Sequence, residues 1–395
     1  MTSDEPACPG FRAAGIAAGI KKTGDPDLAL IVADNPTAGA AVFTENRVKA
    51  APVLLSMERL QGARPQAVLI NSGGANACTG SAGIGDARTL TGSVARSLGI
   101  PQDSVLAAST GVIGQRLPVD RIEKSLGQLI NDLSADGFVR AARAIMTTDT
   151  YPKCIAGSFS SGGRDYRVLG IAKGAGMIFP HLATMLAFAV TDFPIARRPL
   201  EEILKGAVSR SFNAITVDGD MSTNDMVLIL SGGTDRPGNT DSRNGPFREA
   251  LTQLCIGLAR HIVKDAEGAT KLVAITVSGA PDEGTARRIA FQVANSPLVK
   301  TAFFGEDPNW GRIMGALGCV AGSFDPARAE IRFGDVTVAS GGVGCSGDRE
   351  AAAREVMRQR EYTVIIDLGA GSSSFTAYTS DLSVDYVKIN ADYRS

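Results

Sequence analysis

Histidine is almost absent from the 395-residue sequence, which contains only His181 and His261. A histidine-based metal site would have too few ligands, and a Ser-His-Asp triad would have to use one of these two residues. The sequence also contains no Walker A, HExxH or GxSxG pattern. If the chain is an enzyme, we therefore expect its general base to be a group other than imidazole.

The sequence also lacks closely spaced cysteine pairs, a large net charge and long apolar runs. The six cysteines are scattered with no C-x-x-C pair, whereas zinc ribbons and disulfide frameworks need such spacing. The formal net charge is −1, so no basic field exists to hold a nucleic acid. The longest apolar stretch, residues 175–190, is interrupted by Pro180 and His181 and is too short to span a bilayer. With no apolar signal segment at the N-terminus, these absences predict a cytoplasmic protein that binds neither nucleic acid nor membranes.

What is present suits a large globular protein of mixed class. Hydrophobic residues make up 44% of the chain, and its length exceeds the roughly 250–300 residues at which one core stops growing. Short apolar runs predict buried strands, and segments with helical periodicity lie between them. We expect an α/β or α+β protein with layered sheets and helices, while periodicity alone leaves the topology open. The strands are expected at 28–33, 40–43, 67–70 and 184–190, and the helices at 84–98, 118–130, 200–208 and 247–262.

Two segments rich in turn-forming residues divide this pattern. Residues 231–245, SGGTDRPGNTDSRNG, predict a surface loop between a strand and a helix. Residues 279–284, GAPDEG, indicate a second and less distinct boundary, which we take as the boundary between two domains. We divide the chain there into a core domain, residues 1–279, and a C-terminal domain, residues 280–395.

The most informative segment is 173–192, KGAGMIFPHLATMLAFAVTD, which passes from a glycine-rich turn into an apolar strand. A threonine that begins a buried strand after a small residue and a tight loop indicates the precursor of an N-terminal nucleophile. The Thr184 hydroxyl would attack the carbonyl of Ala183, and hydrolysis of the ester would free an α-amine with a pKa of about 7.7–8.0 to act as base. In isolation, the segment favours a simpler interpretation, in which a β-branched residue begins a strand.

Two glycine-rich loops provide candidate binding surfaces. Residues 109–114, STGVIG, precede a helix, where a turn can aim backbone N–H groups and a threonine hydroxyl at a developing oxyanion. Residues 71–80, NSGGANACTG, directly follow a strand, and open α/β sheets often bind ligands at this end of their strands. For each loop an ordinary structural turn is the alternative, and the sequence leaves both interpretations open.

A third glycine-rich segment, residues 342–347, fits the dinucleotide-binding pattern GxGxxG. It follows a predicted strand and precedes a predicted helix, and Asp367 stands about 20 residues further on, as in a dinucleotide fingerprint. However, too little sequence remains after it to complete a nucleotide-binding half. We therefore favour a structural strand-to-helix turn.

Nine longer motifs make the chain similar to a known enzyme family. They are NSGGANACTG, STGVIG, MTTDT, KGAGMIFPHLATML, FNAITVDGD, STND, EGATKL, NSPLVKTAFFGEDPNWGR and DYVKINADYR. On these motifs the sequence resembles, almost end to end, the ornithine acetyltransferase family of arginine biosynthesis, also called glutamate N-acetyltransferase. The resemblance implies a layered α-β-β-α sandwich, with two sheets between helical layers and a smaller C-terminal domain.

The resemblance also implies a self-cleaving precursor. Thr184 matches the family's cleavage site and acetyl-accepting nucleophile. Cleavage after Ala183 would give an α chain of residues 1–183 and a β chain of residues 184–395. The family's usual assembly from αβ heterodimers predicts a heterotetramer of two α and two β chains.

Further residues match the positions that stabilise charge and bind substrate in this family. Thr110 and Gly111 match its oxyanion-hole pair. For Lys173 and Glu267 a solvated surface charge is the alternative interpretation. The positions that match substrate-contacting residues are Thr147, Lys173, Glu267, Asn390 and Ser395, together with Thr184.

The sequence departs from the family pattern at three places. His181-Leu182 stands where the family usually has Asn-Met, so a histidine lies close to the scissile bond, where we expect it to be a spectator. Met221 and Met226 replace threonines in GDMSTNDM, and the last residue is Ser395 where threonine is usual. The first two departures bear on substrate choice, because paralogues of this family serve in specialised metabolism.

The resemblance implies a ping-pong acetyltransferase that needs no metal and no organic cofactor. N-acetylornithine would acylate Thr184, ornithine would leave, and glutamate would take the acetyl group, with the oxyanions held by Thr110 and Gly111. The motifs leave open whether acetyl-CoA also serves as donor. Three alternatives remain, namely a self-processing amidase or aminopeptidase, a paralogue with another acyl donor or acceptor, and an uncleaved metabolite-binding regulator.

Overall fold

The computed structural model describes residues 6–179, 185–232, 241–320 and 324–392, apart from the side chains of 241 and 242. The chain forms two compact units. They divide earlier along the chain than the predicted domain boundary at residue 280, because β11 (Leu272–Ala280) pairs with β15 (Glu361–Asp367) and β16 (Ser373–Ser380) of the second unit. The first unit comprises Met1–Asn213 and Asp220–Ile262, and the second comprises Ala214–Gly219 and Val263–Ser395.

Two sheets form the first unit. One has the order β1-β2-β4-β5, with β4 and β5 parallel and the other neighbours antiparallel. The other has the order β3-β10-β8-β7-β6, in which β8 and β10 are the parallel pair. The strands are β1 (Phe11–Ile16), β2 (Leu28–Ala33), β3 (Ala38–Phe43), β4 (Ala67–Asn71), β5 (Val105–Ser109), β6 (Lys153–Ser161), β7 (Arg164–Lys173), β8 (Leu186–Thr191) and β10 (Met226–Ser231).

The facing sides of these two sheets share one hydrophobic core. Successive residues of a strand point to opposite faces, so Ile31 of β2 joins this core while Leu30 joins the core on the other side of its sheet. Phe188 of β8 and Leu228 of β10 enter the shared core from the second sheet. Burial on both faces explains why β2, LALIVA, contains no polar residue.

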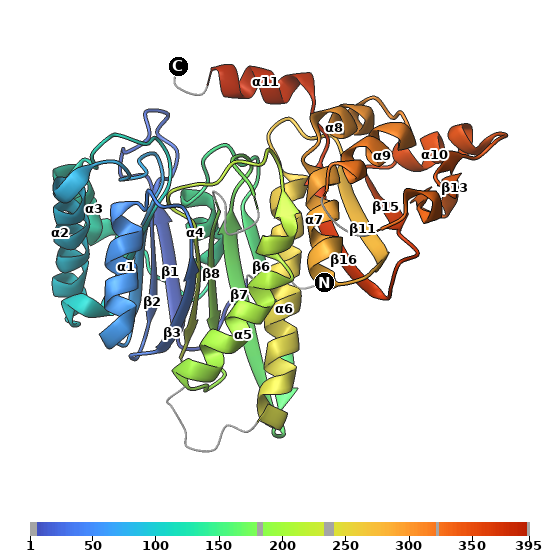
Figure 1. The fold of residues 1–395 in the computed structure, drawn as a ribbon. Helices are drawn as coiled ribbons and strands as arrows, with labels where there is room; N and C mark the ends of the chain where they lie inside the picture. Colours follow the sequence, from blue (N-terminus) through green and yellow to red (C-terminus); the bar gives the residue numbers. More distant parts are fainter. Residues whose placement is uncertain (1–5, 180–184, 233–240, 321–323, 393–395) are drawn as a thin grey trace. The chain divides into compact units, whose positions relative to one another are not determined.

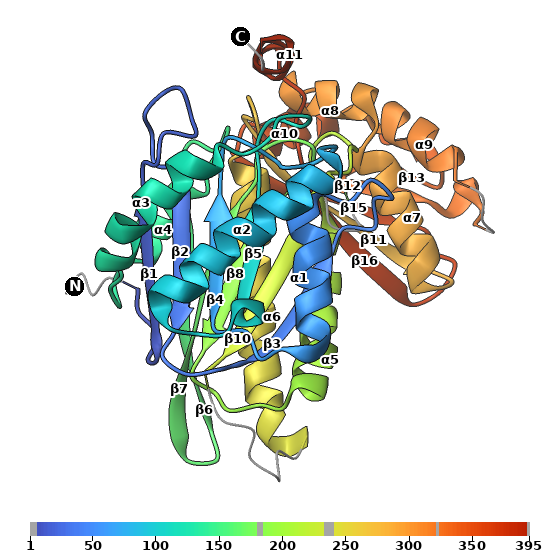
Figure 2. The same cartoon turned by 90° about the vertical axis from the view of Figure 1, so that its left-hand side faces the viewer.

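Helices cover the outer faces of both sheets. Val94 of α2 and Ile122 of α3 pack in the outer core of the first sheet, and α2 crosses in front of β4 and β5 in Figure 2. Over the second sheet lie α5 and α6 (Figure 1), and Leu258 of α6 comes within 2.9 Å of where a Cβ on Gly170 would stand. The layers therefore follow the order helices, first sheet, second sheet, helices, which confirms the predicted α-β-β-α sandwich. The helices are α1 (Ala51–Gly62), α2 (Gly80–Leu98), α3 (Val119–Asn131), α4 (Phe138–Ala144), α5 (Arg197–Ser209) and α6 (Asp241–Lys264).

Local sequence signals place the ends of several elements correctly. Gly99, with φ of 67°, ends α2 in the left-handed conformation that favours glycine. Pro118 immediately precedes α3. The predicted loop 231–245 is shorter than expected because α6 begins at Asp241. The prediction that a strand begins at Thr184 falls on a residue outside the described ranges, and β8 is described from Leu186.

The second unit is built on a seven-stranded sheet of order β14-β13-β12-β15-β11-β16-β9. Ile289 and Val293 of α7 pack with Val273 and Ile275 of β11 in its core. Within the described ranges of both units, no helix has the length and hydrophobicity needed to cross a membrane. The second unit's elements are β9 (Ile215–Thr216), β11 (Leu272–Ala280), α7 (Glu283–Ala294), α8 (Pro297–Phe304), α9 (Trp310–Gly318), β12 (Glu330–Phe333), β13 (Val336–Ser340), β14 (Val343–Gly344), α10 (Arg349–Met357), β15 (Glu361–Asp367), β16 (Ser373–Ser380) and α11 (Val384–Ala391).

The GxGxxG segment is a structural turn of this sheet. β13 and β14 pair antiparallel, and the turn between them contains Gly341 and Gly342, with φ of 63° and 74°. A dinucleotide fingerprint opens a parallel βαβ unit. Here the strand before α10 is the antiparallel β14, and β12 separates β13 from β15. This topology agrees with the structural interpretation favoured from the sequence.

Candidate active site

The two glycine-rich loops predicted as binding surfaces meet at one edge of the first sheet. β4 and β5 are parallel neighbours with Asn71 opposite Ser109, so both loops leave the sheet at the same edge. The Ser109 hydroxyl donates to Asn71 Oδ1 at 2.6 Å, and the Thr110 N–H donates to the Asn71 carbonyl at 2.9 Å. Gly74 forms isolated bridges with Thr110 and Val112. Two motifs that the sequence presents separately are thus parts of one structure.

Gly111 occupies a position that excludes every other residue type. Its φ is 125°, and a Cβ on it would lie 2.4 Å from the carbonyl carbon of Gly73. Thr110 beside it is buried, with 4% of its surface exposed. Because the Thr110 N–H donates to Asn71, the Thr110 hydroxyl and the Gly111 N–H are the candidate donors to an oxyanion at this turn.

Asn224 ties this turn to the second sheet. Its Nδ2 donates to the carbonyl oxygens of Ala75, at 2.6 Å, and Ser109, at 2.8 Å. The next residue, Asp225, accepts the N–H of Met185 on Oδ1 at 2.8 Å. Both residues belong to the STND motif, which contributes to the family resemblance, and neither has a role predicted from the sequence. The available clue was a polar run directly before the apolar strand β10.

A buried cluster of two lysines and one aspartate lies at the end of β7. Lys173 Nζ donates to the Thr147 hydroxyl at 2.7 Å and lies 3.9 Å from Asp149 Oδ2. Lys153 Nζ donates to Asp149 Oδ1 at 2.7 Å. The side chains of Lys173, Lys153 and Asp149 are 2%, 0% and 0% exposed, so the interpretation of Lys173 as a surface charge is wrong. Thr147 and Lys173, which were each predicted to contact substrate, are in direct contact with one another, while Asp149 and Lys153 were missed.

The electrostatics of this cluster favour an ionised Asp149. Burial alone would raise the pKa of Asp149, but the charges of Lys173 and Lys153 and the Gly174 N–H outweigh burial and hold the pKa at about 2, below the ordinary 3.8. A carboxylate that stays ionised can orient both ammonium groups. An ammonium group held in place and largely desolvated is suited to recognise a carboxylate.

Replacing Asp149 with asparagine should destabilise the protein at neutral pH by about 3–5 kcal/mol, because buried ammonium groups would lose their carboxylate partner. The pKa of Asp149 is lower in the folded than in the unfolded chain, so this stabilisation is fully present above about pH 4 and is lost as the pH falls toward 2. Urea unfolding of wild type and Asp149→Asn between pH 7 and pH 2 checks this.

The matched control for that experiment is Asp136→Asn, which removes an exposed partner of Arg140. Exposed ion pairs contribute little to stability, so the free energy of unfolding of this variant should fall by less than about 1 kcal/mol at any pH. Two results would contradict the assignment of Asp149 as the ionised partner of the two lysines. One is a small difference in the free energy of unfolding between wild type and Asp149→Asn at pH 7, and the other is a difference that does not become smaller as the pH falls toward 2.

In the second unit, Glu267 and Asn390 are in contact. Asn390 Nδ2 donates to Glu267 Oε2 at 2.9 Å. Gly268 allows this approach, because its φ is 67° and a Cβ on it would lie 2.5 Å from the backbone nitrogen of Tyr386. The Ser383 hydroxyl, which caps α11, donates to the Gly268 carbonyl at 2.7 Å. Two residues predicted to contact substrate, from motifs far apart in the chain, are thereby brought together.

Several predicted site residues cannot be placed. Ala183, Thr184 and Ser395 lie outside the described residues, as does His181. Of the two methionine departures, Met226 is fully buried in β10 and Met221 is half-buried. Across the described ranges, no group of three or more His, Cys, Asp or Glu side chains is arranged to hold a metal ion.

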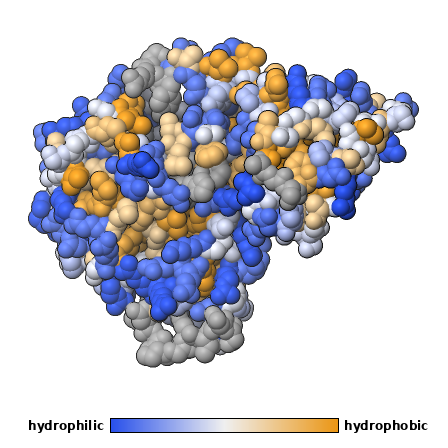
Figure 3. Space-filling model, in the orientation of Figure 1, coloured by the Kyte–Doolittle hydropathy of each residue, from blue (hydrophilic) through white to orange (hydrophobic). Residues whose placement is uncertain are grey.

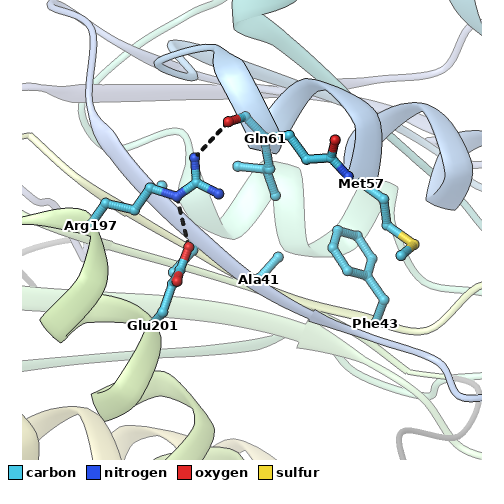
Figure 4. A pocket seen from close by; sticks show the side chains of 9 residues that line it. Ala41, Phe43, Met57, Gln61, Arg197 and Glu201 are labelled. Atoms are coloured by element: carbon cyan, nitrogen blue, oxygen red, sulfur yellow. Dashed lines mark hydrogen bonds and ion pairs between the residues drawn. The ribbon is translucent and has the colours of Figure 1, made fainter.

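A small cavity of about 150 Å³ opens on the first unit away from these motifs. It is lined by apolar side chains, among them Phe43 and Met57, and Arg197 at its rim pairs with Glu201 at 2.7 Å (Figure 4). Hydrophobic surface is visible over this region in Figure 3. The cavity is smaller than the roughly 300–1,000 Å³ of common ligand pockets, and none of its lining residues has a role predicted from the sequence.

Comparison of the sequence with known proteins finds relatives that share one name. It is 51% identical to the arginine biosynthesis bifunctional protein ArgJ of Geobacter sulfurreducens, covering 98% of this chain and 99% of the relative. It is 48% identical to the protein of the same name from Syntrophotalea carbinolica, with the same coverage. A solved structure of ornithine acetyltransferase complexed with ornithine, from Mycobacterium tuberculosis, is 41% identical, covers 44% of this chain and 93% of that chain, and has a TM-score of 0.39. The profile of the ArgJ family matches residues 12–395, so the chain belongs to the ArgJ family.

Proposed function

We propose that this protein is an acetyltransferase of arginine biosynthesis that moves an acetyl group from N2-acetyl-L-ornithine to L-glutamate through Thr184. Family membership and the name shared by its relatives support the activity. The observation that carries the assignment of the site is the Asn224-Asp225 pair. Asn224 donates a hydrogen bond to the carbonyl of Ser109, the residue before Thr110. Asp225 accepts the N–H of Met185, the residue after Thr184. One dipeptide thus links the candidate oxyanion turn to the strand that follows the predicted nucleophile.

The reaction begins with self-cleavage of the precursor. The Thr184 hydroxyl attacks the carbonyl carbon of Ala183, the C–N bond between the two residues breaks, and water hydrolyses the resulting ester. The mature Thr184 then carries a free α-amine beside its own hydroxyl. N-acetylornithine acylates that hydroxyl and releases ornithine, and the amine of glutamate attacks the acetyl ester and leaves as N-acetylglutamate.

We propose the α-amine of Thr184, and not His181, as the base of acetyl transfer. The amine is covalently attached beside the hydroxyl that it deprotonates. After cleavage, His181 belongs to the new end of the α chain, and chain ends are poorly ordered unless they are tied down. The amine also has an ordinary pKa of about 7.7–8.0, close to the pH at which such an enzyme works.

Substrate recognition is divided between two kinds of side chain. Lys173, held by Thr147 and Asp149, offers a buried ammonium group to a substrate carboxylate. Glu267, held by Asn390, offers a carboxylate to a substrate ammonium group. Both amino-acid substrates carry groups of these two kinds. We also propose a substrate contact for Ser395, which the family resemblance alone supports.

Replacing Glu267 with glutamine should raise the KM for the amino-acid substrates while changing kcat less. A hydrogen bond to a charged group contributes about 1.5–3 kcal/mol, which corresponds to a rise in KM of about 10–100-fold. Glutamine keeps an oxygen that can accept from Asn390, so the local structure should persist. Steady-state kinetics with each substrate varied in turn measure the effect.

The control for this variant is Glu361→Gln, which removes the charge of a carboxylate that accepts from Lys264 in the same unit. Its KM values should stay within about twofold of wild type. Unchanged KM values for both substrates in Glu267→Gln would remove Glu267 from the substrate site.

Mass spectrometry of the purified protein incubated with N-acetylornithine tests the proposed function as a whole. We expect two chains, corresponding to residues 1–183 and 184–395, and an acetyl group on the second. Incubation with acetyl-CoA instead tests the second donor that we propose from the word bifunctional in the relatives' name. We also propose that the enzyme is cytoplasmic and assembles from two α and two β chains. Native mass spectrometry of the same sample tests this assembly. Release of acetate without any amine acceptor would favour an amidase.

A further inference from the structure

Lys21 lies in the loop between β1 and β2 and has no part in the mechanism above. Its side chain is half-buried, and Nζ donates to the carbonyl oxygens of Pro26 and Met146, both at 2.8 Å. Both acceptors are uncharged, and among the described residues no carboxylate is in direct contact with this ammonium group. An ammonium group has three hydrogens to donate, so one remains for another partner.

Buried Asp27 fixes this loop beside the candidate oxyanion turn. Its carboxylate accepts three backbone N–H groups of the loop, that of Lys21 at 2.9 Å. Its carbonyl accepts the N–H of Ser72, in the glycine-rich loop after β4, at 2.8 Å. Cγ of Lys21 lies 3.2 Å from where a Cβ on Gly73 would stand, and Gly73 is the residue against which Gly111 packs. The stem of Lys21 therefore lies along the structure that holds the turn.

The ammonium group of Lys21 also lies beside the buried cluster at the end of β7. The Met146 carbonyl that accepts from Lys21 belongs to the peptide bond leading into Thr147, and the Thr147 hydroxyl accepts from Lys173. Burial lowers the pKa of Lys21 below the ordinary 10.5, and the charge of Lys173 acts in the same direction, while nearby carboxylates oppose them. Two ammonium groups are thus separated by one peptide group and one threonine side chain.

Two neighbouring ammonium groups suit a ligand that carries two carboxylates. Glutamate has two, whereas N-acetylornithine has one and ends its side chain in an ammonium group. Lys173, which is buried and held by Thr147, is the partner for the carboxylate that both substrates share. A second ammonium group then finds a partner only in glutamate and repels the corresponding end of N-acetylornithine.

We propose that Lys21 binds the side-chain carboxylate of glutamate and so selects the acetyl acceptor, an inference that rests on the proposed function. The third hydrogen of its ammonium group donates to that carboxylate, while Pro26 and Met146 hold the other two. Lys173 binds the α-carboxylate. Lys21 thereby acts on the second half-reaction and has no part in the acetylation of Thr184 by N-acetylornithine.

Lys21→Gln tests this proposal. Glutamine has two hydrogens to donate to the two carbonyls but carries no charge. In a ping-pong mechanism kcat/KM for each substrate reports its own half-reaction. We expect kcat/KM for glutamate to fall by about 10–100-fold, the usual effect of losing a hydrogen bond to a charged group, and kcat/KM for N-acetylornithine to stay within about twofold of wild type. An unchanged kcat/KM for glutamate, or an equal fall for both substrates, would overturn the proposal.

The matched control is Lys22→Gln, which removes the charge of the adjacent, exposed lysine in the same loop. Both of its kcat/KM values should stay within about twofold of wild type. If Lys22→Gln lowers kcat/KM for glutamate as much as Lys21→Gln does, the positive charge of the loop as a whole explains the effect and the proposal fails.

The charge is tested separately by Lys21→Arg, which should keep most of kcat/KM for glutamate. A fall as large as that of Lys21→Gln would show that charge at this position is not what glutamate requires. Lys21→Met provides a second uncharged variant in case glutamine is not tolerated, and circular dichroism reports whether each variant folds. Folded Lys21→Gln and Lys21→Met that do not cleave would assign Lys21 to self-processing and would also overturn the proposal.

The wild-type protein, measured in parallel, separates this inference from the proposed function. A wild type that transfers no acetyl group from N-acetylornithine to glutamate would overturn both. An active wild type whose kcat/KM for glutamate does not depend on Lys21 would overturn the inference alone.

Discussion

Thr184→Ala is expected to remain a single chain of 41.0 kDa and to have no acetyltransferase activity. Alanine lacks the hydroxyl that attacks the Ala183 carbonyl, so neither the ester intermediate nor the free α-amine can form. The same substitution removes the atom that would carry the acetyl group. A denaturing gel after long incubation and an assay of N-acetylglutamate formation measure the two losses independently.

Thr184→Ser is the matched control, because it keeps a hydroxyl at the same position. We expect it to cleave and to transfer acetyl groups, though more slowly than wild type. Normal processing of Thr184→Ala would eliminate Thr184 as the nucleophile. An uncleaved Thr184→Ser together with an uncleaved wild type would instead favour a protein that acts without self-processing.

Thr110→Ala is expected to lower kcat by about 10²–10³-fold, the usual effect of removing one oxyanion donor. The Thr110 N–H is bound to the Asn71 carbonyl, so the hydroxyl is the group of this residue that we expect to meet the oxyanion. The donor acts mainly in the transition state, and KM should therefore change less than kcat. Self-cleavage should also slow, because it passes through a similar oxyanion.

Thr110→Ser separates the hydroxyl from the methyl group of threonine. It should keep most of the activity, since the oxygen remains and only the methyl group is lost. Steady-state kinetics on fully cleaved samples of both variants are required, so that slow processing is not read as slow turnover. An unchanged kcat in Thr110→Ala would place the oxyanion hole elsewhere.

Features that depend on neighbouring residues along the chain were predictable from the sequence. The uninterrupted apolar run of β2 indicated burial on both faces, because no polar side chain could be directed to water. Gly99 marked the end of α2, because the left-handed conformation needed there favours glycine. The motif containing Thr184 likewise suggested chemistry from the order of residues alone. Its assignment stays a prediction, because Thr184 lies outside the described residues.

Features that depend on distant residues required the tertiary structure. Asn224 reaches the Ser109 carbonyl across 115 positions of sequence, and Met185 reaches the Asp225 carboxyl across 40. Sequence spacing contains no information about such contacts, because they follow from the pairing of β8 with β10 and the packing of two sheets. The same holds for Lys173, which sequence statistics would place at the surface. Its burial against Asp149 arises only when the end of β7 meets the loop before β6.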